Sequence, residues 1–330
     1  MQPALDVVGV GNAIVDVIAT VDDSFIGDRG LVKGAMTLVN AGRSAELYEA
    51  MPPGVAASGG SAANTMAGVA SFGGRAAFIG KVRDDQLGEV FIHDIRATGV
   101  AFEVPPAPEG PSTARCLVQV TPDAERTMNT YLGISALLGP PDVDADVVAS
   151  AGITYCEGYL WDVPVAKEAI RVAMAAAASA DRTVALALCD SYCVDRHRDE
   201  WLDLIEDRVD VVFANEAEVC ALHSTDDLGE ARDRTAEMAR TVVITRGARG
   251  SVAVQGSELA MVPAAEIPDV VDATGAGDLY AAGFLWGLCR GVPLARCAEL
   301  GSLAAAEVIS HVGARPRMAL SRLAATSGLA

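Results

Sequence analysis

The second half of the chain alternates between short apolar segments and longer amphipathic ones, and this alternation limits the folds that it can adopt. The short segments have the length and β-branched content of buried strands, whereas the longer ones carry apolar residues at helical spacing. The predicted order is strand 153–156, helix 165–179, strand 183–189, helix 198–206 and strand 209–214. Strands separated by helices form parallel sheets, because the helix returns the chain to the end of the sheet where the previous strand began. The sequence therefore predicts an α/β fold.

The rest of the chain follows this pattern with one interruption. Residues 113–120 and 126–132 are typical of two antiparallel strands, because Pro122 and Asp123 between them favour a tight turn. The other predicted elements are strands 6–12, 14–21, 76–80, 242–245 and 251–254, a short strand edge at 266–271, and helices 61–72, 86–98 and 293–311. We therefore expect a doubly wound, mainly parallel sheet flanked by helices, with a small second β-structure.

Size and charge exclude several classes of function. With 330 residues, 51% of them hydrophobic, the chain can bury a large core as one domain or two. Its formal net charge of −19 and the lack of a basic run argue against a nucleic-acid partner. The longest apolar run, 279–289, is too short to cross a bilayer, and residues 1–6 lack a basic leader. We expect a soluble, cytoplasmic protein.

The cysteines and histidines show no metal or redox pattern. The seven cysteines include no CxxC pair, and we expect them to be reduced and mostly buried. The four histidines lie in different segments, and none stands at metal-ligand spacing. The histidines are therefore expected to be structural or solvated.

The segment 272–278, of sequence Asp-Ala-Thr-Gly-Ala-Gly-Asp, precedes a helix that is too apolar to lie on the surface. A helix N-terminus presents unpaired amide groups, and glycines let an anion approach them closely. Asp278 in the first helical turn can act as general base toward a hydroxyl held beside that anion. This combination indicates phosphoryl transfer. In the structural alternative, Gly275 and Gly277 only make a tight turn and Asp278 only complements the helix dipole.

Two further motifs follow predicted strands, where ligands bind in doubly wound sheets. Gly60, Ser61 and Asn64 offer a close-approach glycine, a hydroxyl and an amide to a hydroxylated ligand, although a capped turn uses the same residues. Asn12 and Asp16 offer an amide and a carboxylate that suit adjacent hydroxyls of a sugar. For Asp16, capping of a turn is an equal alternative.

Asn215 and Glu218 follow the strand 209–214 and have the spacing of a helix capping box. The functional alternative is that Glu218 holds a hydrated Mg²⁺. Two familiar cofactor motifs are rejected. Ile14 stands where the dinucleotide fingerprint needs its third glycine, and Val82 stands where a P-loop needs serine or threonine.

Taken in their order along the chain, the four motifs resemble the ribokinase-like (PfkB) carbohydrate and nucleoside kinases over nearly the whole chain. Within that family the chain is most similar to the adenosine kinases, through residues 126–132, 158–160 and 209–218. The resemblance implies one kinase domain, 1–330, whose small β lid is formed by about 13–39 and 111–132. It also implies ATP-dependent phosphorylation of the 5′-hydroxyl of adenosine to AMP by direct in-line transfer.

The resemblance assigns roles to individual residues. Asp278 is the base, the amides of Gly275, Ala276 and Gly277 stabilise the transferring phosphoryl group, and Arg126 of the lid reaches the phosphates. The implied acceptor site contains Asn12, Asp16, Gly60, Ser61 and Asn64 around the ribose, with Met36, Leu38, Met128, Leu132 and Tyr159 around the base. The implied Mg²⁺-ATP site contains Asn215, Glu218 (to Mg²⁺ through water), Thr245, Arg246, Gly247, Thr274 and Ser302. Some relatives are also activated by K⁺ near the position of Asp272.

The chain departs from the adenosine kinase pattern at Ala273 and Thr274, which leaves the glycines and the base intact. The expected partners are a small-molecule acceptor and ATP, with a monomer or a lid-mediated homodimer. Another nucleoside, or a sugar such as ribose, fructose or a related polyol, is the alternative acceptor. A non-catalytic ligand-binding protein is a more distant alternative, and the retention of Asp278 with both glycines argues against it.

Overall fold

A computed structural model describes residues 3–123 and 125–329. The larger of its two sheets has eight strands in the order β13-β12-β11-β10-β9-β8-β1-β5. These are β1 (Leu5–Val10), β5 (Ala76–Ile79), β8 (Ala151–Glu157), β9 (Thr183–Ala187), β10 (Val211–Asn215), β11 (Thr241–Thr245), β12 (Ser251–Gln255) and β13 (Glu258–Val262). The six strands from β5 to β11 are parallel, and β12 and β13 add an antiparallel edge. The strand order reverses at β1, so the crevice at its carboxyl end is where a ligand is expected.

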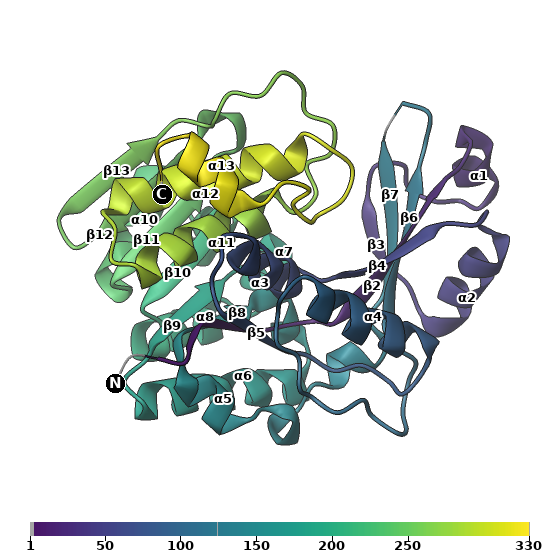
Figure 1. The fold of residues 1–330 in the computed structure, drawn as a ribbon, viewed down its shortest axis with the longest axis horizontal. Coiled ribbons are helices and arrows are strands. Elements are labelled where there is room, and N and C mark those ends of the chain that lie inside the picture. The colour runs from purple at the N-terminus through teal and green to yellow at the C-terminus, as the bar shows by residue number, and fades with distance from the viewer. Residues whose placement is uncertain (1–2, 124, 330) are drawn as a thin grey trace.

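Helices cover both faces of this sheet (Figure 1). One face packs against α3 (Ser61–Ser71), α4 (Gln86–Ala97), α11 (Ala276–Cys289), α12 (Leu294–Ile309) and α13 (Leu320–Thr326). The other packs against α5 (Ala145–Ser150), α6 (Pro164–Ser179), α7 (Ser191–Arg196), α8 (Arg198–Arg208), α9 (Glu216–His223) and α10 (Leu228–Met238). The strands are apolar on both sides because each face is buried, as a parallel sheet requires.

The second sheet stands to one side of the larger one in Figure 1 and has the order β3-β7-β6-β2-β4. Its strands are β2 (Ile14–Thr20), β3 (Met36–Leu38), β4 (Val55–Gly59), β6 (Ala114–Val120) and β7 (Arg126–Tyr131), with α1 (Asp23–Asp28) and α2 (Ala41–Ala50) between them. Both segments predicted for the lid contribute strands, and β4 adds a third segment outside them. Only residues 11–13 separate β1 from β2, and only Gly60 separates β4 from α3. The small sheet is therefore joined to the large one at the expected ligand crevice.

Most of the predicted elements are present, and the doubly wound α/β arrangement is confirmed. The strand edge predicted at 266–271 is wrong, because these residues lie outside the strands and the edge strand is β13 instead. Pro268 has no amide hydrogen to donate to a neighbouring strand, which accounts for the difference. None of the helices in the described part of the chain is long and apolar enough to cross a membrane.

Candidate functional site

The segment 272–278 forms the entry to α11 as predicted. Gly275 is the N-cap and has φ +81°, and a Cβ on it would lie 2.9 Å from the Cα of Ala314. A left-handed conformation and a close backbone therefore both require glycine at this position. Gly277, in the first turn, has open space where its Cβ would be. The first turn is thus open to an anion at Gly277, and its amides have no intrahelical acceptor, although the amide of Ala276 donates to the Ala273 carbonyl at 3.3 Å.

The carboxylate of Asp278 is held by two side chains of α3. Ser61 Oγ donates to its Oδ1 at 2.7 Å, and Asn64 Nδ2 donates to its Oδ2 at 2.9 Å. Burial raises the pKa of Asp278, while these two hydrogen bonds and the cation of Arg315 limit the rise. The structure thus brings three predicted residues together and fixes the direction of a carboxylate with the properties of a general base.

Gly60 turns the chain from the small sheet into α3. Its φ is +100°, and a Cβ would lie 2.1 Å from the carbonyl oxygen of Asn12. Glycine is therefore needed here for the same two reasons as at Gly275. This close approach places the start of α3, and with it Ser61 and Asn64, against the chain that leaves β1.

Asn12 lies deeper than a ligand-facing position predicts, with 2% of its surface exposed. Its Nδ2 donates to Glu157 Oε1 at 2.7 Å, and its Oδ1 accepts from Ser135 Oγ at 2.9 Å. Glu157 also accepts from the amide of Ala62 at 2.9 Å, at the start of α3. Burial raises the pKa of Glu157 to about 7, against these hydrogen bonds, which favour its ionised form. Asn12 and Glu157 thus connect β1, β8 and α3 beneath the site.

The small sheet gathers five predicted residues on one face. Side chains of directly paired residues point to the same side of a sheet. Cys116 pairs with both Asp16 and Thr130, and Thr130 pairs with Leu38; Met128 pairs with Met36. Arg126, Met128 and Thr130 alternate along β7, so they share this side. The face therefore combines Asp16 and Arg126 with Met36, Leu38 and Met128.

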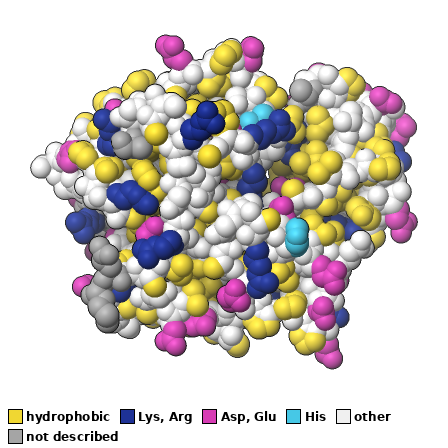
Figure 2. All heavy atoms as spheres, in the orientation of Figure 1, with side chains coloured by type: hydrophobic (Ala, Val, Ile, Leu, Met, Phe, Trp, Pro, Cys, Tyr) yellow, Lys and Arg dark blue, Asp and Glu magenta, His cyan; other side chains and the backbone are white. Residues whose placement is uncertain are grey.

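Two of these apolar side chains lie open to solvent, Met36 with 49% and Leu38 with 60% of their surface exposed. Figure 2 shows hydrophobic side chains gathered on the side of the molecule that carries the small sheet. Asp16 is half-buried beneath them, and burial raises its pKa to about 6, although the Arg126 and Arg315 cations oppose the rise. An open apolar surface next to a carboxylate suits a ligand with a flat ring and hydroxyl groups.

Arg126 forms an ion pair with Asp272, in which the side chains are only 8% and 3% exposed. Asp272 also accepts from the amides of Thr274, at 3.0 Å, and Gly313, at 2.8 Å. The backbone hydrogen bonds and the cation together hold the pKa of Asp272 below its usual range, against its burial. The ion pair joins the small sheet to the loop before α11, and Thr274 contributes its backbone to that loop.

A cavity of about 160 Å³ lies beside the first turn of α11. It is lined by Thr245 and Gly247 after β11, by Ser302 of α12, and by Ala276 and Gly277. Its other walls are Gly250, Ala264, Ala265, Tyr280, Ala305, Ala306 and Ile309. The Ser302 hydroxyl fixes the wall at Ala265, because it accepts a hydrogen bond from the Ala265 amide at 2.8 Å. Small, mostly apolar walls that open onto accessible helix amides suit a flat base with a phosphate chain.

Asn215 and Glu218 form the capping box. Asn215 Oδ1 accepts from the Glu218 amide at 2.9 Å, and Glu218 accepts in return from the Asn215 amide at 2.9 Å and from its side-chain amide at 2.7 Å. Burial raises the pKa of Glu218 to about 7. Arg246, the neighbour of Thr245, donates from Nε to Glu216 at 3.1 Å. Both oxygens of Glu218 thus have protein donors, and a hydrated metal would have to share them.

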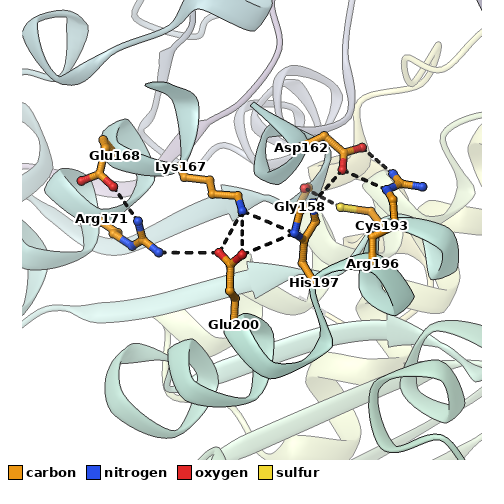
Figure 3. A network of polar contacts seen from close by, with 9 residues as sticks. All are labelled: Gly158, Asp162, Lys167, Glu168, Arg171, Cys193, Arg196, His197 and Glu200. Atoms are coloured by element: carbon orange, nitrogen blue, oxygen red, sulfur yellow. Dashed lines mark hydrogen bonds and ion pairs between the residues drawn. The ribbon is translucent and has the colours of Figure 1, made fainter. Parts of the chain in front are cut away.

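Leu132 directly follows β7 of the small sheet, and Tyr159 follows β8 of the large sheet. Leu132 is half-buried before the 3₁₀ helix η1 (Gly133–Leu137), and Tyr159 is 41% exposed in η3 (Gly158–Asp162). Figure 3 shows how the end of η3 is anchored: Asp162 accepts from Arg196 and lies 3.0 Å from His197 Nε2. His197 in turn contacts the ion pair of Lys167 with Glu200. These contacts tie the segment that carries Tyr159 to α6, α7 and α8.

The same network brings His197, which the sequence predicts to be structural or solvated, close to two other groups that can bind metals. Asp162, Cys193 and His197 bring their ligand atoms within 4.8 Å of one another. Cys193 lies on α7, and His197 is the residue that joins α7 to α8. Arg196 already occupies both oxygens of Asp162, so the cluster is accounted for as an ion-pair network.

Residues 6–319 match the family described as pfkB family carbohydrate kinase. The chain belongs to this family. Among solved structures it is similar to an adenosine kinase from Sinorhizobium meliloti, with 52% identity, a TM-score of 0.91 and coverage of 98% of this chain and 99% of that one. It is equally similar to a probable sugar kinase from Rhizobium etli, with 50% identity, a TM-score of 0.93 and coverage of 99% and 100%. A 5-dehydro-2-deoxygluconokinase from Geobacillus thermodenitrificans is 28% identical, over 76% of this chain and 78% of its own length.

These similarities confirm the ribokinase-like α/β fold and a kinase of the pfkB family, which acts on carbohydrates or nucleosides. Three of the motifs that carry the family resemblance meet near the carboxyl end of β1, those at Asn12, at 60–64 and at 272–278, whereas Asn215 and Glu218 follow β10 of the same sheet. The similar proteins divide between a nucleoside and sugars as acceptor, so family membership alone leaves the acceptor of this pfkB kinase open.

Sequence reasoning missed two side chains of this pfkB-family site. Glu157 had a signal, because it is an ionisable residue at the carboxyl end of the otherwise apolar strand β8. Arg315 had none, since it lies in the connection after α12, where arginines are common on surfaces. Only the folded chain shows that Arg315 reaches Asn64.

Proposed function

We propose that the protein is an ATP-dependent kinase that phosphorylates the 5′-hydroxyl of adenosine by direct in-line transfer. The observation that carries the proposal is the carboxylate of Asp278, oriented by Ser61 and Asn64 at the mouth of α11. A base beside accessible helix amides matches what transfer of a phosphoryl group to an alcohol requires. The 52% identity to an adenosine kinase over almost the whole chain supports the acceptor.

In this proposal Asp278 accepts the proton of the attacking hydroxyl at Oδ1 or Oδ2. The amides of Gly275, Ala276 and Gly277 stabilise the negative charge on the transferring group. Gly277 allows the closest approach because no side chain stands over it. Asp278 accepts only the proton, and the hydroxyl oxygen attacks the phosphorus directly, so no covalent bond forms between the phosphoryl group and the protein. Closure of the small sheet would exclude water, which otherwise competes as acceptor.

The cavity beside α11 fits ATP, which would supply the phosphoryl group, with Thr245, Gly247 and Ser302 in its walls. We assign Arg126 to the phosphates, where its planar guanidinium can bind two oxygens at once. Asn215 and Glu218 would lie near Mg²⁺, with Glu218 holding a water of the ion. The oxygens of Glu218 accept hydrogen bonds from Asn215, and a carboxylate has lone pairs left for such a water. A K⁺ ion at Asp272 would have to compete with Arg126.

We assign the acceptor to the face of the small sheet. Asp16 would bind the ribose hydroxyls together with Asn64 and the backbone at Gly60. Asn12 retains one side-chain amide hydrogen for the same purpose. Met36, Leu38 and Met128 would cover the base, with Tyr159 and Leu132 at the rim. The exposed apolar side chains favour a nucleoside over a free sugar, because a free sugar has no apolar ring to cover them.

The decisive experiment compares kcat/KM for ADP release from Mg²⁺-ATP with adenosine, inosine, guanosine, ribose and fructose. A strong preference for adenosine supports the proposal. A preference for ribose or fructose keeps the chemistry of Asp278 and replaces the acceptor, in agreement with the similarity to a probable sugar kinase. A lack of turnover with every acceptor contradicts the proposed function.

A further inference from the structure

Arg315 enters the site from the connection after α12, far in sequence from the residues that it meets. Its Nε donates to Asn64 Oδ1 at 2.7 Å, and its Nη2 donates to Ser58 Oγ at 3.1 Å. Ser58, at the end of β4, is itself fixed by Asp94 Oδ2, to which its hydroxyl donates at 2.6 Å. The guanidinium thus lies between the small sheet and α3.

The contact with Asn64 decides which way its side-chain amide points. An asparagine amide can be turned over, which exchanges its donor and its acceptor. Arginine has donors only, so the atom of Asn64 that faces Arg315 must be the oxygen. The nitrogen then faces Asp278, where it donates at 2.9 Å. The ionised carboxylate of Asp278 accepts only, so it also selects the nitrogen, and Arg315 and Asp278 together hold the amide of Asn64 in one orientation.

The charge of Arg315 is not used in a direct ion pair within residues 3–123 and 125–329. Its two hydrogen bonds go to the neutral side chains Asn64 and Ser58, and its Nη1 is buried with no hydrogen-bond partner in the described chain. Burial of a cation with an unused donor is unfavourable. An apolar side chain could fill the same space without this cost. The nearby carboxylates of Asp16, Asp94 and Asp278 instead keep it charged, although burial lowers its pKa to about 10.

We propose that Arg315 is a positioning residue of the kinase site, which helps to orient the Asn64 amide toward Asp278 and places a positive charge close to that carboxylate. The inference rests on the proposed role of Asp278 as general base. Arg315 acts through Asn64 and through its field, and it does not itself take part in the transfer. The direct consequence is that the pH dependence of the reaction, and not only its rate, depends on Arg315.

Asp278 is surrounded by groups on several elements, and each contributes to its titration. Hydrogen bonds from Ser61 and Asn64 and the charge of Arg315 lower its pKa, while burial raises it. The other titratable groups near it are Asp16 of β2, Tyr155 and Glu157 of β8, Tyr159 of η3 and Cys189 after β9. Arg315 is the cation whose charge lowers the pKa of Asp278, so its removal should raise that pKa further.

The test compares Arg315→Gln and Arg315→Lys with Arg317→Gln, an exposed arginine two positions away. We expect Arg315→Gln to reduce kcat by roughly 10- to 100-fold, as for loss of a charged hydrogen bond. We also expect it to move the acidic limb of the kcat/KM profile to higher pH. Arg315→Lys keeps the charge and should leave the limb closer to that of the wild type. Arg317→Gln should leave both rate and profile unchanged.

A second measurement needs no substrate. The ¹³C signal of the Asp278 carboxyl, identified by its absence in Asp278→Asn, should titrate at higher pH in Arg315→Gln than in the wild type. An unchanged titration and an unchanged pH profile would overturn the role of Arg315. If Arg315→Gln fails to fold, Arg315→Lys decides: a titration close to that of the wild type with a reduced rate is expected, whereas a wild-type rate would show that the planar guanidinium is not needed for Asn64. If the wild type phosphorylates no acceptor, the proposed function fails, while the carboxyl titration still tests the effect of Arg315 on Asp278.

Discussion

Asn64 and Asp278 are 214 positions apart in the chain, and the side-chain amide of Asn64 donates to the Asp278 carboxylate at 2.9 Å. Asn64 lies on α3, which follows the small sheet through Gly60 alone, whereas Asp278 lies in the first turn of α11, whose neighbours Ala276 and Gly277 line the cavity that we assign to ATP. The hydrogen bond therefore links the structure that we assign to the acceptor with the structure that we assign to ATP. Displacement of α3 would turn the base away from the acceptor.

Replacement of Asp278 by asparagine should remove turnover and leave ATP binding intact. The amide cannot accept the hydroxyl proton, and loss of a general base typically costs about 10²- to 10⁴-fold in kcat. ATP binding, measured by calorimetry, should change little because the helix amides and the cavity remain. Asp269→Asn, at an exposed position in the preceding loop, is the matched control and should be fully active. A rate near that of the wild type in Asp278→Asn would refute the assignment of the base.

The two glycines before Asp278 should respond differently to alanine. Gly275→Ala places a Cβ on a residue with φ +81° and against Ala314, so the free energy of unfolding should fall by about 1–2 kcal/mol or more. Gly277→Ala meets no atom and should leave stability unchanged, while its methyl group obstructs the approach of phosphate oxygens. We expect a tenfold or greater fall in kcat/KM for ATP in a normally stable protein. Urea unfolding and ADP release separate the two effects, and equal stability losses would contradict the argument.

The sequence predicted those parts of the fold and site that rest on local patterns. Apolar periodicity located the parallel strands, and glycines next to Asp278 and Ser61 marked the two helix entries. The strand β4 was missed because its sequence, Val-Ala-Ala-Ser-Gly, is short and weakly apolar, and it pairs with β2 from a distance of about forty residues. Arg315 was missed because a long-range contact gives its residue no local signature. Pairings of this kind depend on the completed fold.

Glu157 should make stability depend on pH. Its pKa is about 7 in the folded protein against 4.5 in the reference state, so the folded state binds the proton more tightly. Stability from this group is therefore present below pH 4.5 and is lost as the pH rises to about 7. Glu157→Gln has no such titration. The free energy of unfolding of the wild type should therefore fall relative to that of the variant from pH 5 to pH 8. Urea titrations at several pH values measure it.

The control for this prediction is Glu237→Gln, at an exposed position on α10. Its difference from the wild type should stay near zero at every pH. A difference for Glu157→Gln that is constant between pH 5 and pH 8 would show that Glu157 remains ionised throughout. In that case its three hydrogen bonds, from Ala62 and from the backbone and side chain of Asn12, outweigh its burial.

Arg126 should affect ATP more than the acceptor. It extends from β7 to Asp272, beside the loop that precedes the helix amides, and its guanidinium is buried there with Nε unpaired within the described chain. We expect Arg126→Ala to raise the KM for ATP about tenfold or more, as loss of a charged contact to phosphate predicts, and to change the acceptor KM much less. Arg126→Lys should lie between, because lysine keeps the charge but not the planar fork. Arg322→Ala, at an exposed position on α13, is the control. Asp272 keeps its two backbone donors in Arg126→Ala. An unchanged ATP dependence would therefore mean that Arg126 serves only to hold the small sheet against the loop.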